Sequence, residues 1–103
     1  RALAIFAPMT DRELARQLRQ LSRIALMLAS ELRHGHLDEE LIEEIDRRME
    51  QGIAADPRGA ALRPVVDALR ESTMTPRPEL MGDTIRACER LRDAIDALVG
   101  RLH

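Results

Sequence analysis

The sequence contains almost no aromatic side chains: Trp and Tyr are absent, and Phe6 is the one phenylalanine among 103 residues. Aromatic residues usually supply the largest buried areas, about 150–250 Å² each, so the core must be built from Leu, Ile, Val, Met and Ala. A chain of this length forms one domain and buries only about 60–65% of the surface of its unfolded form. Such a core is thin for a lone monomer, and oligomerisation is a common remedy.

Cysteine is also scarce, and lysine and asparagine do not occur at all. The single cysteine, Cys88, excludes a disulfide framework and a cysteine-based metal cage. All 16 basic residues are arginine, which is typical of a GC-rich coding sequence and favours a bacterial origin. No run of 18 apolar residues occurs, so we expect no bilayer-spanning segment, no membrane partner and a cytoplasmic location.

The overall composition indicates a folded chain, with 45% apolar and 33% charged residues. The net charge of −2 gives no general attraction to nucleic acid or to an acidic membrane. Met9-Thr10-Asp11 resembles a start codon followed by a helix cap. We therefore expect residues 1–9 to be a flexible N-terminal arm or a vector-derived remnant, and residues 10–103 to form a single helical domain.

The first predicted helix has signals at both ends. Thr10 is a suitable N-cap, Glu13 completes a capping box, and Gly35 can end the helix near His34. The expected length is roughly 23 residues, or about 35 Å. Its apolar positions repeat in steps of four and three, as in a heptad seam. They are Leu14, Leu18, Leu21, Ala25, Leu28 and Leu32.

A second long helix is expected from about Glu79 to Arg101, and it carries a similar apolar seam. That seam consists of Met81, Ile85, Cys88, Leu91, Ile95, Leu98 and Leu102. Between the long helices we expect a short acidic helix capped by Asp38 and ending before Gly52. A turn at 57–62 and a helix from Pro64 to about Ser72 follow. Thr75-Pro76-Arg77-Pro78 is the strongest breaker in the chain.

These elements predict an all-α fold, a small bundle of about four helices with two long amphipathic ones. Residues 24–29 are apolar on every face of their helix, and one intramolecular neighbour would not cover them. We therefore expect a homodimer that uses this stretch and the C-terminal seam. Whether the long helices pair within one chain or between two stays open. The candidate partner-binding or dimer-seam residues are Leu21, Ile24, Leu28, Leu32, Cys88, Leu91, Ile95 and Leu98.

Charge is distributed unevenly along the chain. Residues 1–33 carry six arginines against three acidic residues, whereas residues 34–56 carry two arginines against eight acidic residues. Four arginines follow helical spacing and could contact phosphates without any sequence motif. They are Arg12, Arg16, Arg19 and Arg23. Residues 10–18 resemble the first helix of a helix-turn-helix motif, but residues 19–22 continue the helix where that motif needs a turn.

No catalytic arrangement is indicated. Cys88 lies in the apolar seam, where a small buried hydrophobe is expected. His34 and His36 flank Gly35 and could ligate a metal with help from Asp38 or Glu39, but no convincing third and fourth ligands are placed. A histidine at a helix C-terminus also has a plain capping role. We expect no enzyme, no cofactor and no metal.

The sequence favours a non-catalytic regulatory or adaptor module, homodimeric, that binds a helix of another protein in an apolar groove. The partner and the pathway are unknown. The alternative is a helical DNA-binding transcriptional regulator that uses the arginine row of the first helix. The two differ in salt dependence, since phosphate binding weakens steeply as salt rises and groove binding does not.

Overall fold

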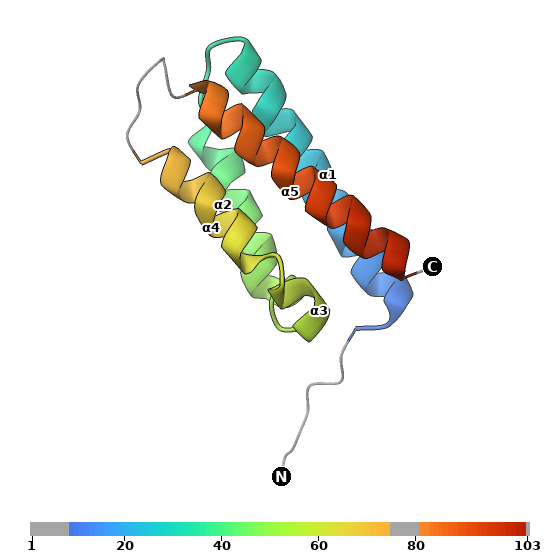
Figure 1. Ribbon diagram of the computed structural model, residues 1–103. Helices are drawn as coiled ribbons and strands as arrows, with labels where there is room; N and C mark the ends of the chain where they lie inside the picture. The colour runs from blue at the N-terminus through green and yellow to red at the C-terminus, as the bar shows by residue number, and fades with distance from the viewer. Residues whose placement is uncertain (1–8, 75–80, 103) are drawn as a thin grey trace.

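The computed structural model describes residues 9–74 and 81–102, and every regular element within them is helical (Figure 1). The first helix, α1, spans Asp11–Arg33, which is 23 residues. Thr10 caps its N-terminus, because the hydroxyl oxygen accepts a hydrogen bond from the backbone N–H of Glu13 at 3.1 Å. The predicted start and length of this helix are confirmed.

The end of α1 is set by a Schellman motif centred on Gly35. This glycine has a φ of 83°, a left-handed conformation in which other residues are strained. Its N–H donates to the carbonyl oxygen of Leu32, and the N–H of His36 donates to that of Glu31, both at 2.9 Å. The predicted end near His34 is therefore confirmed.

The second long helix, α5, spans Met81–Arg101 and lies antiparallel along α1 (Figure 1). Its predicted start at Glu79 lies outside the described residues, as does the Pro-rich breaker at 75–78. The contact between α1 and α5 is the most extensive one between any two elements. The two long helices thus pair within one chain.

A second layer of shorter elements covers one side of this pair (Figure 1). It consists of α2 (Glu39–Arg48), the π-helical turn η1 (Met49–Ile53), α3 (Pro57–Ala60) and α4 (Arg63–Ser72). Asp38 caps α2, as predicted, and Asp56 caps α3, which forms a helical turn within the turn predicted at 57–62. Within this layer α2 packs on α1 and α4 packs on α5, but α2 and α4 touch each other only lightly.

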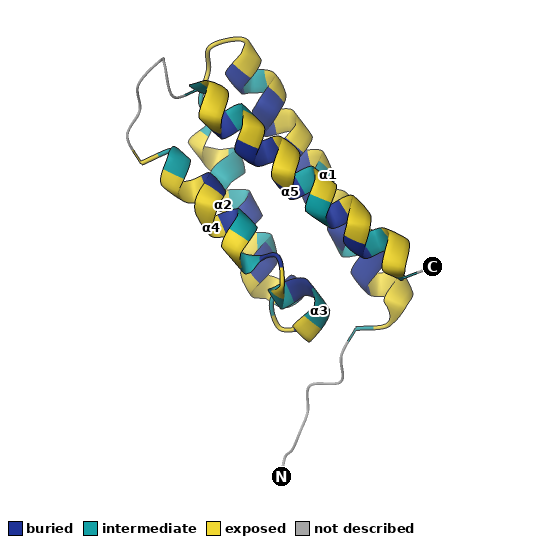
Figure 2. Ribbon diagram, in the orientation of Figure 1, coloured by how far each residue is buried: buried dark blue, intermediate teal, exposed yellow. Residues whose placement is uncertain are grey.

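The core lies between the two layers and is formed by the inward faces of all four main helices (Figure 2). Its largest fully buried side chains are Leu14, Leu18, Leu21, Leu28, Ile45, Met49, Ile53, Leu69, Leu91, Ile95, Val66 and Cys88. All are aliphatic or sulfur-containing, as the lack of aromatic residues predicts. No described helix is both long and apolar enough to cross a membrane.

The connection after α2 contains a feature that the sequence did not reveal. The α-helix ends at Arg48, ahead of Gly52 as predicted, but the chain continues through η1 and buries Met49 and Ile53 completely. Gly59 of α3 then passes close to this turn. A Cβ atom at Gly59 would lie 2.0 Å from the carbonyl oxygen of Ile53, so only glycine fits without a shift of the backbone.

Candidate partner-binding groove

The eight residues predicted as a partner-binding or dimer seam lie inside the chain itself. They are Leu21, Ile24, Leu28, Leu32, Cys88, Leu91, Ile95 and Leu98, and none is more than 9% exposed. The reason is that the seams of α1 and α5 cover each other within one chain. A surface for a partner must therefore be sought among exposed residues.

The stretch at 24–29 is only partly covered by the rest of the chain. Ile24, Ala25, Leu28 and Ala29 are buried. Leu26 and Met27 face outward and are 43% and 49% exposed. Two adjacent large apolar side chains are thus left in solvent on α1.

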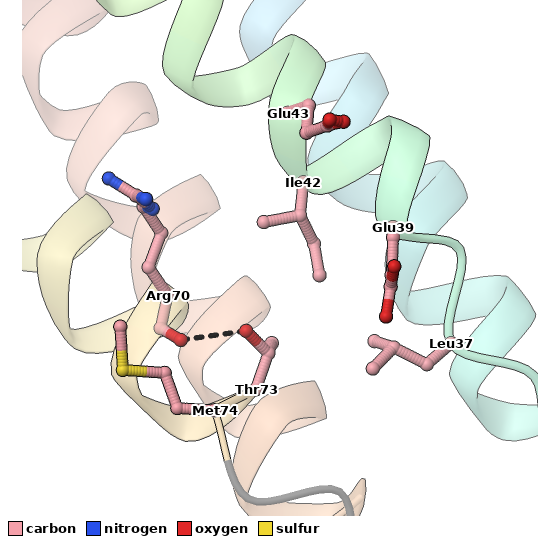
Figure 3. Close-up of a pocket in the computed structure, with 7 residues that line it drawn as sticks. All are labelled: Leu37, Glu39, Ile42, Glu43, Arg70, Thr73 and Met74. Carbon is pink, nitrogen blue, oxygen red and sulfur yellow. Dashed lines mark hydrogen bonds between the residues drawn. The ribbon is translucent and has the colours of Figure 1, made fainter.

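A surface groove lies where the start of α2 faces the end of α4 (Figure 3). It has a volume of about 280 Å³ and is lined by Leu37, Glu39, Ile42, Glu43, Arg70, Thr73 and Met74. A second depression of about 290 Å³ continues along the same helices; it shares Ile42, Glu43 and Arg70 and adds Asp46, Arg47 and Glu50. We call these two connected depressions the α2–α4 groove.

The groove exists because α2 and α4 turn their apolar stripes toward the long helices and not toward each other. Ile45 of α2 and Leu69 of α4 are buried in the core. Ile42 is offset from that stripe and points into the space between the two helices (Figure 3). The apolar part of the groove's lining, which we call the floor, consists of Ile42, Leu37 and Met74, and Met74 is 72% exposed.

Ion pairs tie the two walls of the groove together at one point. Asp46 of α2 accepts hydrogen bonds from Arg63 at 3.5 Å and from Arg70 at 3.4 Å, both on α4. Near the open end, the Thr73 hydroxyl donates to the carbonyl oxygen of Arg70 at 2.7 Å (Figure 3). The two hydrogen bonds to Asp46 join the walls, whereas the Thr73 bond is local to the end of α4.

One wall of the groove carries three exposed carboxylates. Glu39, Glu43 and Glu50 are exposed, and none forms an ion pair with a described residue. Glu44 of α2 differs from them because it pairs with Arg47 and Arg48. A hydrogen bond from Arg48, with the charge of Arg47, holds the pKa of Glu44 below its usual value. The acidic wall consisting of Glu39, Glu43 and Glu50 is thus available to an external cation.

The predicted arginine row lies on the outer face of α1. Arg12, Arg16, Arg19 and Arg23 are all exposed, and Leu26 continues the same face one turn later. A hydrogen bond from Arg48 to the side-chain oxygen of Gln20 links α2 to α1.

A partly buried ionic cluster, which the sequence did not reveal, ties α3 to the start of α1. Asp56 is 2% exposed and accepts hydrogen bonds from the backbone and the guanidinium of Arg58. Arg58 also pairs with Asp11 and donates to the Met9 carbonyl at 2.9 Å. Its guanidinium holds the pKa of Asp56 below its usual range. In the sequence, Asp56-Pro57 indicates a helix cap, but no local pattern indicates that Arg58 contacts Asp11 and Met9.

Cys88 is fully buried in the seam of α5. Burial raises the pKa of its thiol to about 11; the positive charge of Arg33 opposes this increase, and the negative charge of Glu89 adds a smaller one. The thiol is therefore protonated at neutral pH and packs as a small hydrophobe.

The described residues define a compact all-α globule of four main helices, without strands, that carries a mixed apolar and acidic groove on its short-helix layer. No protein-family model, curated protein or solved structure matches the chain. Function must therefore be inferred from the groove and from the charges around it.

Proposed function

We propose that this chain is a non-catalytic regulatory or adaptor protein that binds a helix of a partner protein in the α2–α4 groove. The observation that supports this function is the combination of an apolar floor with an acidic wall whose carboxylates form no ion pair with a described residue. Helix-in-groove recognition uses this combination, in which apolar anchors supply affinity and charges set orientation.

The chemistry of the groove specifies the partner. Leu37, Ile42 and Met74 are suited to one or two large aliphatic side chains of an amphipathic helix. The acidic wall has spacings of four and seven residues along α2 and η1. A partner helix lying alongside would present Arg or Lys at matching intervals, because residues four and seven apart share one face of a helix.

The test is a pull-down from a nuclease-treated lysate of the native cells, read by mass spectrometry. The wild-type chain is compared with a double charge reversal in the acidic wall, Glu43→Lys with Glu50→Lys. The matched control reverses two exposed acids on α5, Asp93→Lys with Asp96→Lys, and changes the net charge equally. A partner kept by the control and lost with the wall variant supports the groove. A partner kept by both variants contradicts it.

We further propose that two copies associate through the outer face of α1 around Leu26 and Met27. The exposure of these adjacent side chains and the thin, aromatic-free core support a homodimer. Changing both residues to Ser should convert a dimer into a monomer in sedimentation analysis while leaving the helical content unchanged. Leu28→Asp cannot serve here, since Leu28 is fully buried and its loss would unfold the chain. A wild-type chain that sediments as a monomer would contradict the dimer.

The second candidate function is DNA binding by a transcriptional regulator, favoured by the exposure of four aligned arginines on α1. Phosphate contacts of this kind release counterions, so affinity for a DNA duplex would fall steeply with salt. Fluorescence anisotropy of a labelled duplex between low and physiological salt tests this function. The Arg12→Gln and Arg16→Gln double variant should bind the duplex more weakly, and its affinity should depend less steeply on salt concentration. If the wild-type chain does not bind the duplex at low salt, the DNA-binding hypothesis is wrong.

A further inference from the structure

The loop between α1 and α2 brings one imidazole and two carboxylates together. Glu31, His36 and Asp38 each offer a ligand atom, and these atoms all lie within 4.8 Å of one another. We propose that these three side chains bind a divalent transition-metal ion, with zinc as the reference ion. The proposal is independent of the groove and adds a site to the same molecule.

The end of α1 and the start of α2 hold these three residues close together in the metal-free chain. The hydrogen bond from the His36 N–H to the Glu31 carbonyl oxygen, at 2.9 Å, holds the two residues next to each other. In Schellman motifs these positions frequently carry an apolar pair, whereas here they carry an imidazole and a carboxylate. The turn after α1 brings Glu31 and His36 together. Because residues five apart do not share a helix face, their spacing in the sequence does not predict this contact.

Asp38 is held by its role as the N-cap of α2. One of its carboxylate oxygens accepts hydrogen bonds from the N–H groups of Glu40, at 3.0 Å, and Leu41, at 3.4 Å. The second oxygen remains for a metal, because an ionised carboxylate offers about four lone-pair positions. No described cation forms an ion pair with Glu31 or Asp38.

The donor set favours one class of ion. Imidazole nitrogen with carboxylate oxygen suits zinc and the neighbouring transition metals, while magnesium prefers oxygen ligands alone in octahedral geometry. Zinc bonds of about 2.0–2.2 Å in a tetrahedron place ligand atoms roughly 3.4 Å apart. The ligand atoms of the three side chains, now within 4.8 Å of one another, would reach this separation by small side-chain rotations. A water molecule would be the fourth ligand.

His34 is excluded from the site, and this makes it a matched control. Its Nδ1 lies 2.8 Å from the carbonyl oxygen of Ser30, where the ring caps the last turn of α1. His34 and His36 are both exposed and only two residues apart. Unspecific binding to surface histidines would therefore involve both residues equally.

The test is isothermal titration of the whole chain with zinc chloride in a non-chelating buffer, followed by the same titration with magnesium. The wild type should bind one zinc ion per chain and no magnesium. His36→Gln and Glu31→Gln should each weaken zinc binding roughly tenfold or more. Asp38→Asn should do the same while keeping a good N-cap. His34→Gln should bind zinc as the wild type does.

Circular dichroism of the metal-free variants separates loss of a ligand from loss of the fold. Zinc should also raise the melting temperature of the wild type and of His34→Gln but not that of His36→Gln, because a ligand stabilises only the state that binds it. The proposal is overturned if the wild type binds no stoichiometric zinc. It is equally overturned if correctly folded His34→Gln and His36→Gln lose the same affinity.

Discussion

The two layers of the bundle are held in place in different ways. α1 and α5, with 23 and 21 residues, bury continuous apolar seams against each other. α2 and α4 have ten residues each, touch only lightly, and are joined through η1 and α3. Helices of ten residues are marginal when isolated, so the short layer depends on packing against the long pair.

This comparison shows where a helical bundle of this size can place a binding surface. In the long pair, side-chain burial determines the arrangement and leaves little apolar surface between the helices. In the short layer, caps such as Asp56 and the bridge from Asp46 to Arg63 and Arg70 set the positions of the helices. Because α2 and α4 turn their apolar stripes toward the long helices, the space between them stays open as the groove.

The largest expected effect comes from truncating a side chain in the long pair. Leu91 is fully buried between the layers, and Leu91→Ala should lower the free energy of unfolding by about 2–5 kcal/mol. Ile42→Ala, at the groove floor, should lower it by only about 1 kcal/mol because Ile42 is partly exposed. Urea denaturation followed by circular dichroism measures both. Equal losses would mean that the two layers do not differ in packing.

A smaller effect is expected at the crowded turn of the short layer. Gly59→Ala should destabilise the chain by about 1–3 kcal/mol, because the new methyl group meets the backbone of η1. Gly100→Ala is the matched control, since nothing lies within 4 Å of its added Cβ. There the change should be neutral or stabilising by up to about 1 kcal/mol, as alanine favours helix. Thermal unfolding of both variants tests the close contact between Gly59 and η1. A Gly59→Ala variant as stable as the wild type would contradict this contact.

The smallest effect concerns the ionic cluster that anchors α3. The pKa of Asp56 is lower in the folded chain than in the unfolded chain, so its ionised form stabilises the fold above the usual carboxylate range. This contribution is lost as the pH falls through the folded pKa, below about 4. Asp56→Asn keeps a capping side chain but removes the charge that faces Arg58.

Denaturation of the wild type and of Asp56→Asn at neutral and acidic pH measures this contribution. The wild type should be the more stable of the two at neutral pH, and the gap should close in acid. A gap that stays constant with pH would show that the cap, and not the charge, anchors α3.

The sequence predicted the long elements well because their signals are local. Thr10 and Gly35 mark the ends of α1, and the spacing of its leucines identifies the buried face. The same seam residues were expected to face a partner, since periodicity tells which side of a helix is apolar but not what covers it. In the structure α5 covers the seam of α1 within one chain. The apolar residues that remain exposed are instead Leu26, Met27 and those of the groove floor.

The sequence alone was enough to predict the helical class, the caps, the core composition and the separation of basic and acidic segments. Each of these features depends on residues that lie within about one or two helical turns of one another in the chain. The tertiary structure alone decided the pairing of the long helices within one chain, the opening between α2 and α4, the reach of Arg58 and the grouping of Glu31 with His36 and Asp38. These features join residues through packing and turns, and contacts of that kind leave no period or spacing in the chain.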